Sequence, residues 1–251
     1  MTLTTAECVS AIERHSAGFA EATRGNLDAS VRHCPGWTVA DLVAHLTDVH
    51  WFWGTIAEKG LTEPPDEADR PARAPRERLV PAFEEGARRL VRVLGEADQT
   101  RHVWTWAPSQ KDVAFITRHQ VQEAAVHHWD AVHAAGGRLR IEAAVAADSV
   151  DEFLTFSVPT DAAPLEDDDA PPAPLAATFA LRATDADRAW TITDGASPGT
   201  LRVDQGAVAG PPAVQATASD LLLWLYRRVE IDTASVPTDV VERFRALTFT
   251  D

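Results

Sequence analysis

Apolar residues recur at intervals of three and four along four segments of residues 1–140, which is the spacing of amphipathic helices. The expected helices are about Thr4–Arg24, Val39–Lys59, Arg76–Glu96 and Val113–Ala135. In the second helix the core-facing stripe comprises Leu42, Leu46, Val49, Trp53 and Ile56. Helices of this number and length predict a four-helix bundle, a fold whose interior commonly holds metal sites.

Local signals mark where these helices begin and end. Thr38 follows the loop His33–Trp37 and is a typical N-cap residue for the second helix. A charged, Pro-rich connection, Glu63–Pro75, separates the second helix from the third. Gly136 and Gly137 follow the fourth helix and form a C-terminal stop signal.

The chain changes character after the fourth helix. One more helix is expected at Glu142–Thr155, followed by an acidic, Pro-rich linker, Val158–Pro174, that contains the run Glu166–Asp169. Short alternating segments then predict antiparallel strands, and two helices close the chain; the strands are expected near 177–182, 189–193, 201–203 and 213–217, the helices near Ser219–Arg228 and Thr238–Leu247. The sequence therefore predicts an α+β protein of two domains, residues 1–140 and 141–251.

Charge and composition exclude several classes of protein. A formal net charge of -15 opposes binding to nucleic acid or to an anionic membrane. No apolar run approaches the ~18 residues that a membrane span needs, and the N-terminus lacks a signal-peptide pattern, so we expect a cytoplasmic protein. Two cysteines, Cys8 and Cys34, are too few for a disulfide scaffold or a cysteine-rich zinc site.

The fourth helix carries the most informative stripe. The residues within about 60° of Glu123 on the helical wheel are mostly polar: Ile116, His119, Gln120, His127 and Asp130. The stripe either faces solvent or lies inside with its charges compensated, because an unpaired buried carboxylate would be costly. Glu123 and His127 are four apart, so both side chains can reach one cation.

His45 on the second helix favours the interpretation in which the stripe lies inside with its charges compensated. It lies at the margin of the apolar stripe, where a single histidine is more often a core residue than a ligand. Together with Glu123 and His127 it would form a three-ligand site with an open position, as catalytic metal sites do. His119 is an alternative or fourth ligand, and Asp130 could orient His127 without binding the ion itself.

Other candidate residues are weaker. Cys34 is expected to be a structural loop thiol, and the sequence contains neither a Gly-rich phosphate loop nor a Gly-x-Ser-x-Gly motif. Arg227 and Arg228 follow an apolar run. They could simply stabilise a helix C-terminus, or one of them could bind an anionic group of a substrate.

Two segments resemble a known family. The segment Cys34–Leu46, with sequence CPGWTVADLVAHL, and the segment Glu123–Asp130, with sequence EAAVHHWD, are similar to the two signature segments of the mycothiol-dependent maleylpyruvate isomerase family. The resemblance implies a DinB-like metal-binding four-helix bundle followed by a small α+β domain. It also implies that His45, Glu123 and His127 bind a divalent ion, usually zinc, and that Arg227 is an anion contact.

The resemblance identifies the residues of the site more specifically than it identifies the reaction. A cation held by two neutral histidines and one carboxylate keeps a net positive charge and can stabilise a low-molecular-weight thiol as thiolate. The resemblance implies mycothiol and a small, anionic electrophile as partners, and either cis-trans isomerisation or S-transfer as the reaction. Two other functions stay open: a hydrolase that uses metal-bound water, and a non-catalytic protein that binds a ligand in the bundle.

Overall fold

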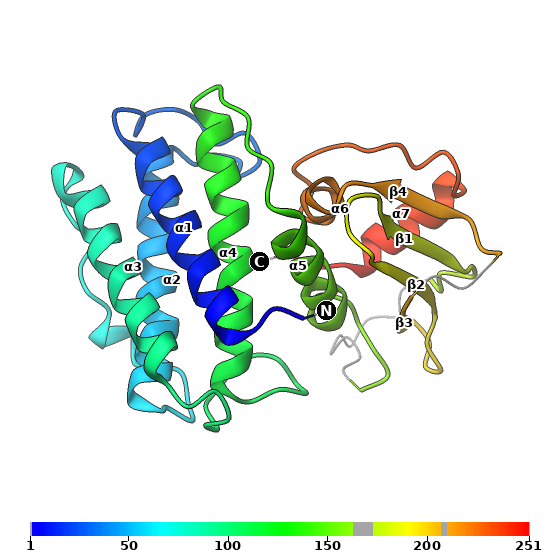
Figure 1. Cartoon of the computed structure of the whole chain (residues 1–251), viewed down its shortest axis with the longest axis horizontal. Coiled ribbons are helices and arrows are strands. Elements are labelled where there is room, and N and C mark those ends of the chain that lie inside the picture. The colour runs from blue at the N-terminus through cyan, green and yellow to red at the C-terminus, as the bar shows by residue number, and fades with distance from the viewer. Residues whose placement is uncertain (1, 163–172, 207–209, 251) are drawn as a thin grey trace. The chain divides into compact units, whose positions relative to one another are not determined.

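The structure is a computed structural model that describes residues 2–162, 173–206 and 210–250 (Figure 1). The chain divides into two compact units, Met1–Ile141 and Glu142–Asp251. The first unit is helical, and the second contains helices and a four-stranded sheet. The expected α+β fold class is thereby confirmed. No helix in the described part of the chain is long and apolar enough to cross a membrane.

The first unit is a bundle of four long helices. They are α1 (Thr5–Thr23), α2 (Val39–Lys59), α3 (Leu79–Glu96) and α4 (Val113–Ala134). Thr38 caps α2 as expected: its hydroxyl accepts from the Asp41 amide, and the Asp41 carboxylate accepts from the Thr38 amide at 3.0 Å. At the other end of α2, Gly60 has a φ of 66°, a left-handed conformation that glycine adopts at little cost.

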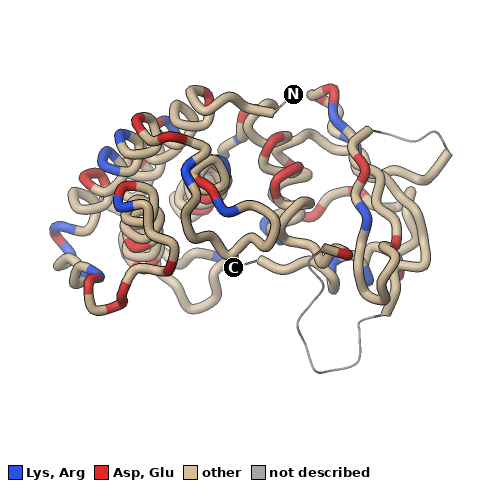
Figure 2. Tube along the Cα trace, turned by 90° about the horizontal axis from the view of Figure 1, so that it is seen from below, with Lys and Arg blue, Asp and Glu red and all other residues tan. Residues whose placement is uncertain are grey.

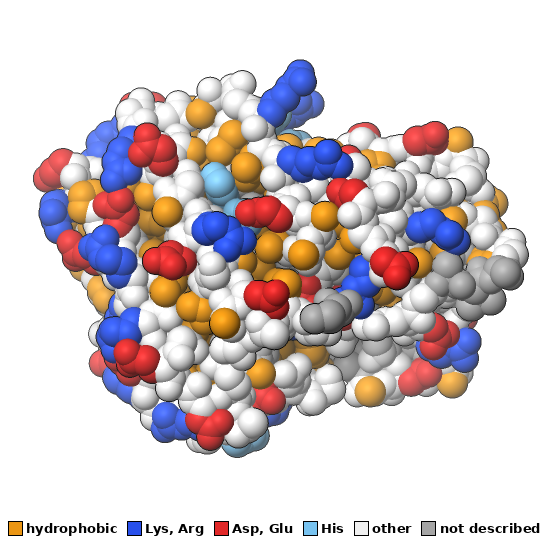
Figure 3. All heavy atoms as spheres, in the orientation of Figure 1, with side chains coloured by type: hydrophobic (Ala, Val, Ile, Leu, Met, Phe, Trp, Pro, Cys, Tyr) orange, Lys and Arg blue, Asp and Glu red, His pale blue; other side chains and the backbone are white. Residues whose placement is uncertain are grey.

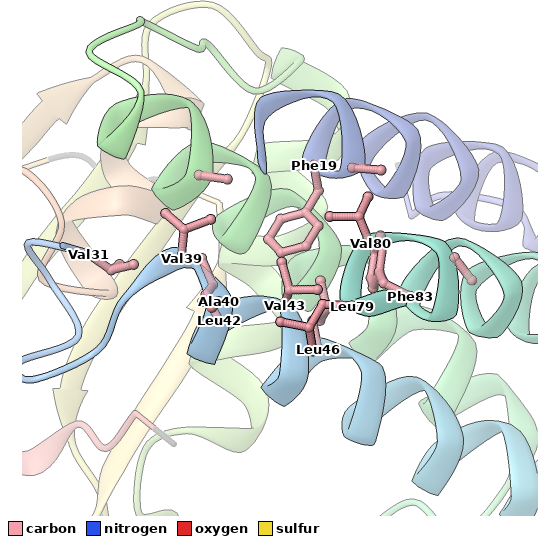
Figure 4. Close-up of a cluster of buried hydrophobic side chains, with 13 residues drawn as sticks. Phe19, Val31, Val39, Ala40, Leu42, Val43, Leu46, Leu79, Val80 and Phe83 are labelled. Carbon is pink, nitrogen blue, oxygen red and sulfur yellow. The ribbon is translucent and has the colours of Figure 1, made fainter. Parts of the chain in front are cut away.

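Aromatic and aliphatic side chains from all four helices form the centre of the bundle (Figure 4). The rings of Phe19 on α1 and Phe83 on α3 lie 4.7 Å apart between centroids. Val43 and Leu46 of α2 pack against them, and all four side chains are fully buried. The stripe predicted for α2 therefore faces the core, because burial of these apolar groups is what holds an amphipathic helix to its neighbours.

The connection between α2 and α3 is partly ordered by two short 3₁₀ turns, η1 (Glu67–Asp69) and η2 (Arg76–Arg78). Asp66 caps the first turn, its carboxylate accepting from the Ala68 amide at 2.9 Å. The third helix consequently begins at Leu79, three residues later than its hydrophobic pattern predicts. Arg76 to Arg78 form the tighter turn that commonly precedes an α-helix.

The second unit contains α5 (Ala143–Phe156), α6 (Ala218–Leu225), α7 (Thr238–Leu247) and a four-stranded sheet. The strands are β1 (Phe179–Ala183), β2 (Ala189–Asp194), β3 (Leu201–Gln205) and β4 (Ala213–Ala216), in the order β3-β2-β1-β4. The buried Asp151 carboxylate of α5 accepts from Trp190 Nε1 at 3.0 Å and from Gln205 Nε2 at 2.6 Å. These bonds join the helix to two strands and satisfy the buried acid.

Two details of the second unit differ from the sequence-based expectation. The pairs β1–β2 and β2–β3 are antiparallel, but β1 and β4 pair in parallel. The helix expected to reach Arg228 ends at Leu225, because Arg227 takes a left-handed conformation. The linker around Val158–Pro174 is described only at its two ends, and its acidic run Glu166–Asp169 lies outside the described residues.

Charged residues of both signs are interspersed on the bundle. Basic and acidic positions follow one another closely on the helices of the bundle (Figure 2), and the face in Figure 3 intersperses both signs among hydrophobic side chains. Several of these charges are paired at the surface, for example Arg24 with Glu84 at 2.5 Å and Arg89 with Glu58. Such exposed pairs each contribute little to stability.

Candidate metal centre

The structure brings three predicted donors together inside the bundle. One donor atom from each of His45, Glu123 and His127 lies within 4.8 Å of the others. His127 Nε2 and Glu123 Oε2 are 3.7 Å apart, and the rings of His45 and His127 meet edge to face with centroids 5.2 Å apart. Donors of a tetrahedral zinc site, each about 2.1 Å from the ion, are roughly 3.4 Å apart. The donor set and its spacing therefore fit a divalent ion.

The polar stripe of α4 is buried, so the solvent-facing interpretation of it is wrong. Only 11% of each of the Glu123 and His127 side chains is accessible. Ile116, Gln120 and Asp130 on the same face are buried as well. Placing this many polar groups in a helical core is costly unless they have a partner or a ligand.

Asp130 fixes the orientation of His127. Its Oδ2 lies 3.1 Å from His127 Nδ1, and its carboxylate is fully inaccessible to solvent. A carboxylate at this place favours the tautomer in which Nδ1 carries the proton and Nε2 keeps its lone pair. Nε2 is the atom on the Glu123 side. The arrangement is the one expected of a histidine held ready for a cation.

Trp37 covers His45. The two ring centroids are 5.1 Å apart, and Trp37 belongs to the loop that ends at the Thr38 cap of α2. In the same loop Cys34 is half-buried and is not part of a disulfide, and its backbone carbonyl accepts from the Trp37 amide at 3.0 Å. This part of the first signature segment thus places an aromatic wall beside the candidate ligand.

His119 does not join the three donors. Its ring stacks on Phe115 at 5.3 Å, and Trp53 and Trp106 meet it edge-on. Its Nδ1 lies 2.8 Å from Gln122 Nε2. The imidazole is thereby enclosed by aromatic rings and engaged with a neighbour on its own helix, which indicates a packing role.

His50 on α2 is a buried histidine that the sequence analysis does not single out. It is completely buried beside Phe83, with ring centroids 5.2 Å apart, and neither ring nitrogen has a hydrogen-bond partner among the described residues. Burial, and then the charges of His127 and His45, lower the pKa of His50 to about 3. The imidazole therefore stays neutral in the folded chain. Its position four residues after Leu46 and three before Trp53 was the available sequence signal.

This buried histidine gives the chain a specific pH dependence. Between about pH 6.5 and 3, unfolded chains protonate His50 and folded chains do not, so the free energy of unfolding falls as the pH falls. His50→Leu is expected to remove a slope of about 1.4 kcal/mol per pH unit over this window. Urea titrations at several pH values, with a chelator present, measure it. The exposed His102→Ala variant should retain the wild-type slope, and parallel curves for wild type and His50→Leu would contradict this assignment.

Arg227 lies in the second unit at the end of α6. Its φ is 61°, a left-handed conformation at a position where glycine is usual. Its guanidinium donates to the Arg245 carbonyl at 2.6 Å, at the end of α7, and burial lowers the pKa of Arg227. Arg228 donates instead to the Tyr226 carbonyl at 2.8 Å.

The fold and these three donors define a protein that joins a helical-bundle domain with a candidate metal centre to a small α+β unit. Residues 9–132 match the family described as "Mycothiol maleylpyruvate isomerase N-terminal domain". The bundle of this chain is therefore an N-terminal domain of the mycothiol maleylpyruvate isomerase family, the family that its two signature segments resemble.

Solved structures support the same fold. The chain is similar to the crystal structure of the mycothiol-dependent maleylpyruvate isomerase, with a TM-score of 0.59 and 14% identity over 89% of this chain and 90% of that one. A histidine-to-alanine mutant of that enzyme matches with the same TM-score at 13% identity. No curated protein sequence matches this chain. At such low identity the likeness establishes the fold, and the chemistry has to be argued from the site.

Proposed function

We propose that this chain is a divalent-metal-dependent enzyme that activates a low-molecular-weight thiol, mycothiol, for attack on an electrophilic small molecule. The observation that carries the proposal is the group His45, Glu123 and His127, whose side chains are partly or fully buried and whose donor atoms lie within 4.8 Å of one another. Membership of the family, through residues 9–132, supports mycothiol as the thiol. The reaction is cis-trans isomerisation or S-transfer to the electrophile.

Each residue of the site has a defined part in this proposal. His45, Glu123 and His127 would hold the ion, and a set of two nitrogen donors and one oxygen donor favours zinc. When bound, the ion supplies the positive charge that favours a thiolate near neutral pH. Asp130 keeps His127 Nε2 directed at the site, and the low accessibility of the donors limits competition from water. No protein nucleophile is required.

Thiol dependence separates the proposal from its alternatives. Purified protein should contain about one equivalent of divalent metal and should convert a cis-configured, electron-poor alkene, or a bimane electrophile, only when mycothiol is added. An isomerase regenerates the thiol, whereas an S-transferase consumes it in proportion to product. Ester or amide hydrolysis without thiol would instead indicate a hydrolase, and a protein inert towards all of these compounds would indicate a binding function.

Arg227 is our proposed contact for an anionic group of the electrophile. Because Arg227 also holds the end of α7, loss of activity alone would not identify its role. Arg227→Gln is expected to raise KM roughly tenfold or more for a carboxylate-bearing electrophile and to leave KM for the corresponding neutral ester unchanged. Arg228→Gln is the matched control. Equal effects on both electrophiles would limit Arg227 to supporting the fold.

A further inference from the structure

A cavity lies between α2 and α3, apart from the candidate metal centre. Its volume is about 300 Å³, and none of the three donor residues lines it. The walls are mainly apolar, formed by Ala44 and Trp51 of α2, by Pro71 and Ala72, and by Ala82 of α3. A cavity of this size and lining suits a small organic molecule with an apolar body.

Four charged side chains also line the cavity, and two of them are well paired. Arg73 donates to the Asp41 carboxylate at 3.0 Å. Arg89 donates to the Glu58 carboxylate through Nε at 3.2 Å and also through a terminal nitrogen. Both arginines are therefore occupied by carboxylates outside the cavity, which reduces their attraction for an anionic ligand.

The two acids of the cavity differ from each other. Glu85 accepts a hydrogen bond from Arg78 at 3.1 Å. Asp48 forms a long ion pair with Arg70, at 3.9 Å, which is too long for a hydrogen bond, and Arg70 itself donates to Glu67 at 2.7 Å. Partial burial raises the pKa of Asp48 in spite of Arg70. Its carboxylate is the least compensated charge in the cavity.

Asp48 and Trp51 stand one helical turn apart. Residues three apart on an α-helix are neighbours on one face, and both line the same cavity. A carboxylate next to an indole ring is a recurrent way to bind an organic cation, since the carboxylate pairs with the charge and the ring face attracts it. The formal net charge of -15 further favours a cation over an anion.

We propose that the cavity between α2 and α3 binds a small organic ammonium ion whose nitrogen lies against Asp48 and Trp51 and whose apolar body fills the space lined by Ala44, Ala72 and Ala82. The site is separate from the metal centre. It does not depend on the proposed thiol chemistry, because none of its residues belongs to that centre.

The test compares 2-phenylethylammonium with its neutral analogue 2-phenylethanol by calorimetry on the full chain. The ammonium is expected to bind with a Kd on the order of 1 mM or below, and more tightly than the alcohol. Asp48→Asn should weaken ammonium binding roughly tenfold or more and leave the alcohol unaffected. Arg70→Gln should strengthen ammonium binding, since Arg70 competes for Asp48.

Two further variants locate the binding. Ala82→Leu fills the cavity and should abolish binding of both compounds, whereas the exposed Glu77→Gln, which removes a charge elsewhere on the bundle, should change neither. Circular dichroism establishes that each variant is folded, and Trp51→Leu replaces Ala82→Leu if the latter is not. The proposal is overturned if the wild-type chain shows no saturable ammonium binding, or if Asp48→Asn binds the ammonium as tightly as wild type.

Discussion

His45→Ala and Glu123→Ala are each expected to lose more than about 100-fold in metal affinity, because even removal of a residue that only orients a metal ligand typically costs 10–100-fold. Each change leaves two of the three donors that lie within 4.8 Å of one another, and two donors do not hold a divalent ion against competing water and buffer. Thiol-dependent activity should fall with the bound metal. Elemental analysis after gel filtration, followed by the thiol-transfer assay, measures both quantities.

The controls for this experiment come from α4, the helix that carries Glu123. His133→Ala removes a half-buried histidine that stacks on Trp129 at 4.7 Å outside the donor group, and it should retain metal. Asp130→Asn should give an intermediate result, a 10–100-fold loss of affinity, because the orienting carboxylate is replaced while all donors stay. Full metal retention in both His45→Ala and Glu123→Ala would remove the basis of the proposed function.

Phe83→Ala is expected to lower the free energy of unfolding of the bundle by about 3–5 kcal/mol. The ring is fully buried and touches Phe19 across the centre of the bundle (Figure 4). Its loss removes apolar contact and leaves a cavity that helices from three directions can only partly close. Urea unfolding followed by tryptophan fluorescence measures the change, since six of the eight tryptophans lie in residues 1–141.

Phe249→Ala is the matched control, because it makes the same substitution at an exposed phenylalanine. This phenylalanine is 43% exposed, so its removal should change the free energy of unfolding by well under 1 kcal/mol. A similar small effect for Phe83→Ala would mean that the bundle repacks freely around the lost ring. In that case the rigid placement of α2 against α4, on which the donor geometry depends, would also be in doubt.

The bundle and its donors could be predicted because the relevant information is local. The recurrence of apolar residues gives each helix and its buried face, Thr38 marks the start of α2, and Gly136 marks the end of α4. Glu123 and His127 are neighbours on any α-helix. Only the approach of His45 required that two helices be placed correctly, and here the resemblance of Cys34–Leu46 to a known family supplied what periodicity could not.

The features that were missed depend on contacts between distant segments. His50 is buried because Phe83 of another helix packs against it, and nothing in its own segment encodes that neighbour. The parallel pairing of β1 with β4 joins strands separated by β2 and β3, whereas alternation along a strand reports only which face is buried. The early end of α6 reflects the left-handed Arg227, which helix propensity does not anticipate.

The candidate metal centre draws its donors from two helices, with Glu123 and His127 on α4 and His45 on α2. An ion held there would connect these helices, and the free energy of its binding would add to the free energy that keeps them associated. Metal occupancy and the cohesion of the bundle would then be thermodynamically coupled. Removal of the metal would then weaken the association of α2 with α4 and also abolish the metal-dependent activity. Metal supply would thereby affect how long the folded protein persists in the cell.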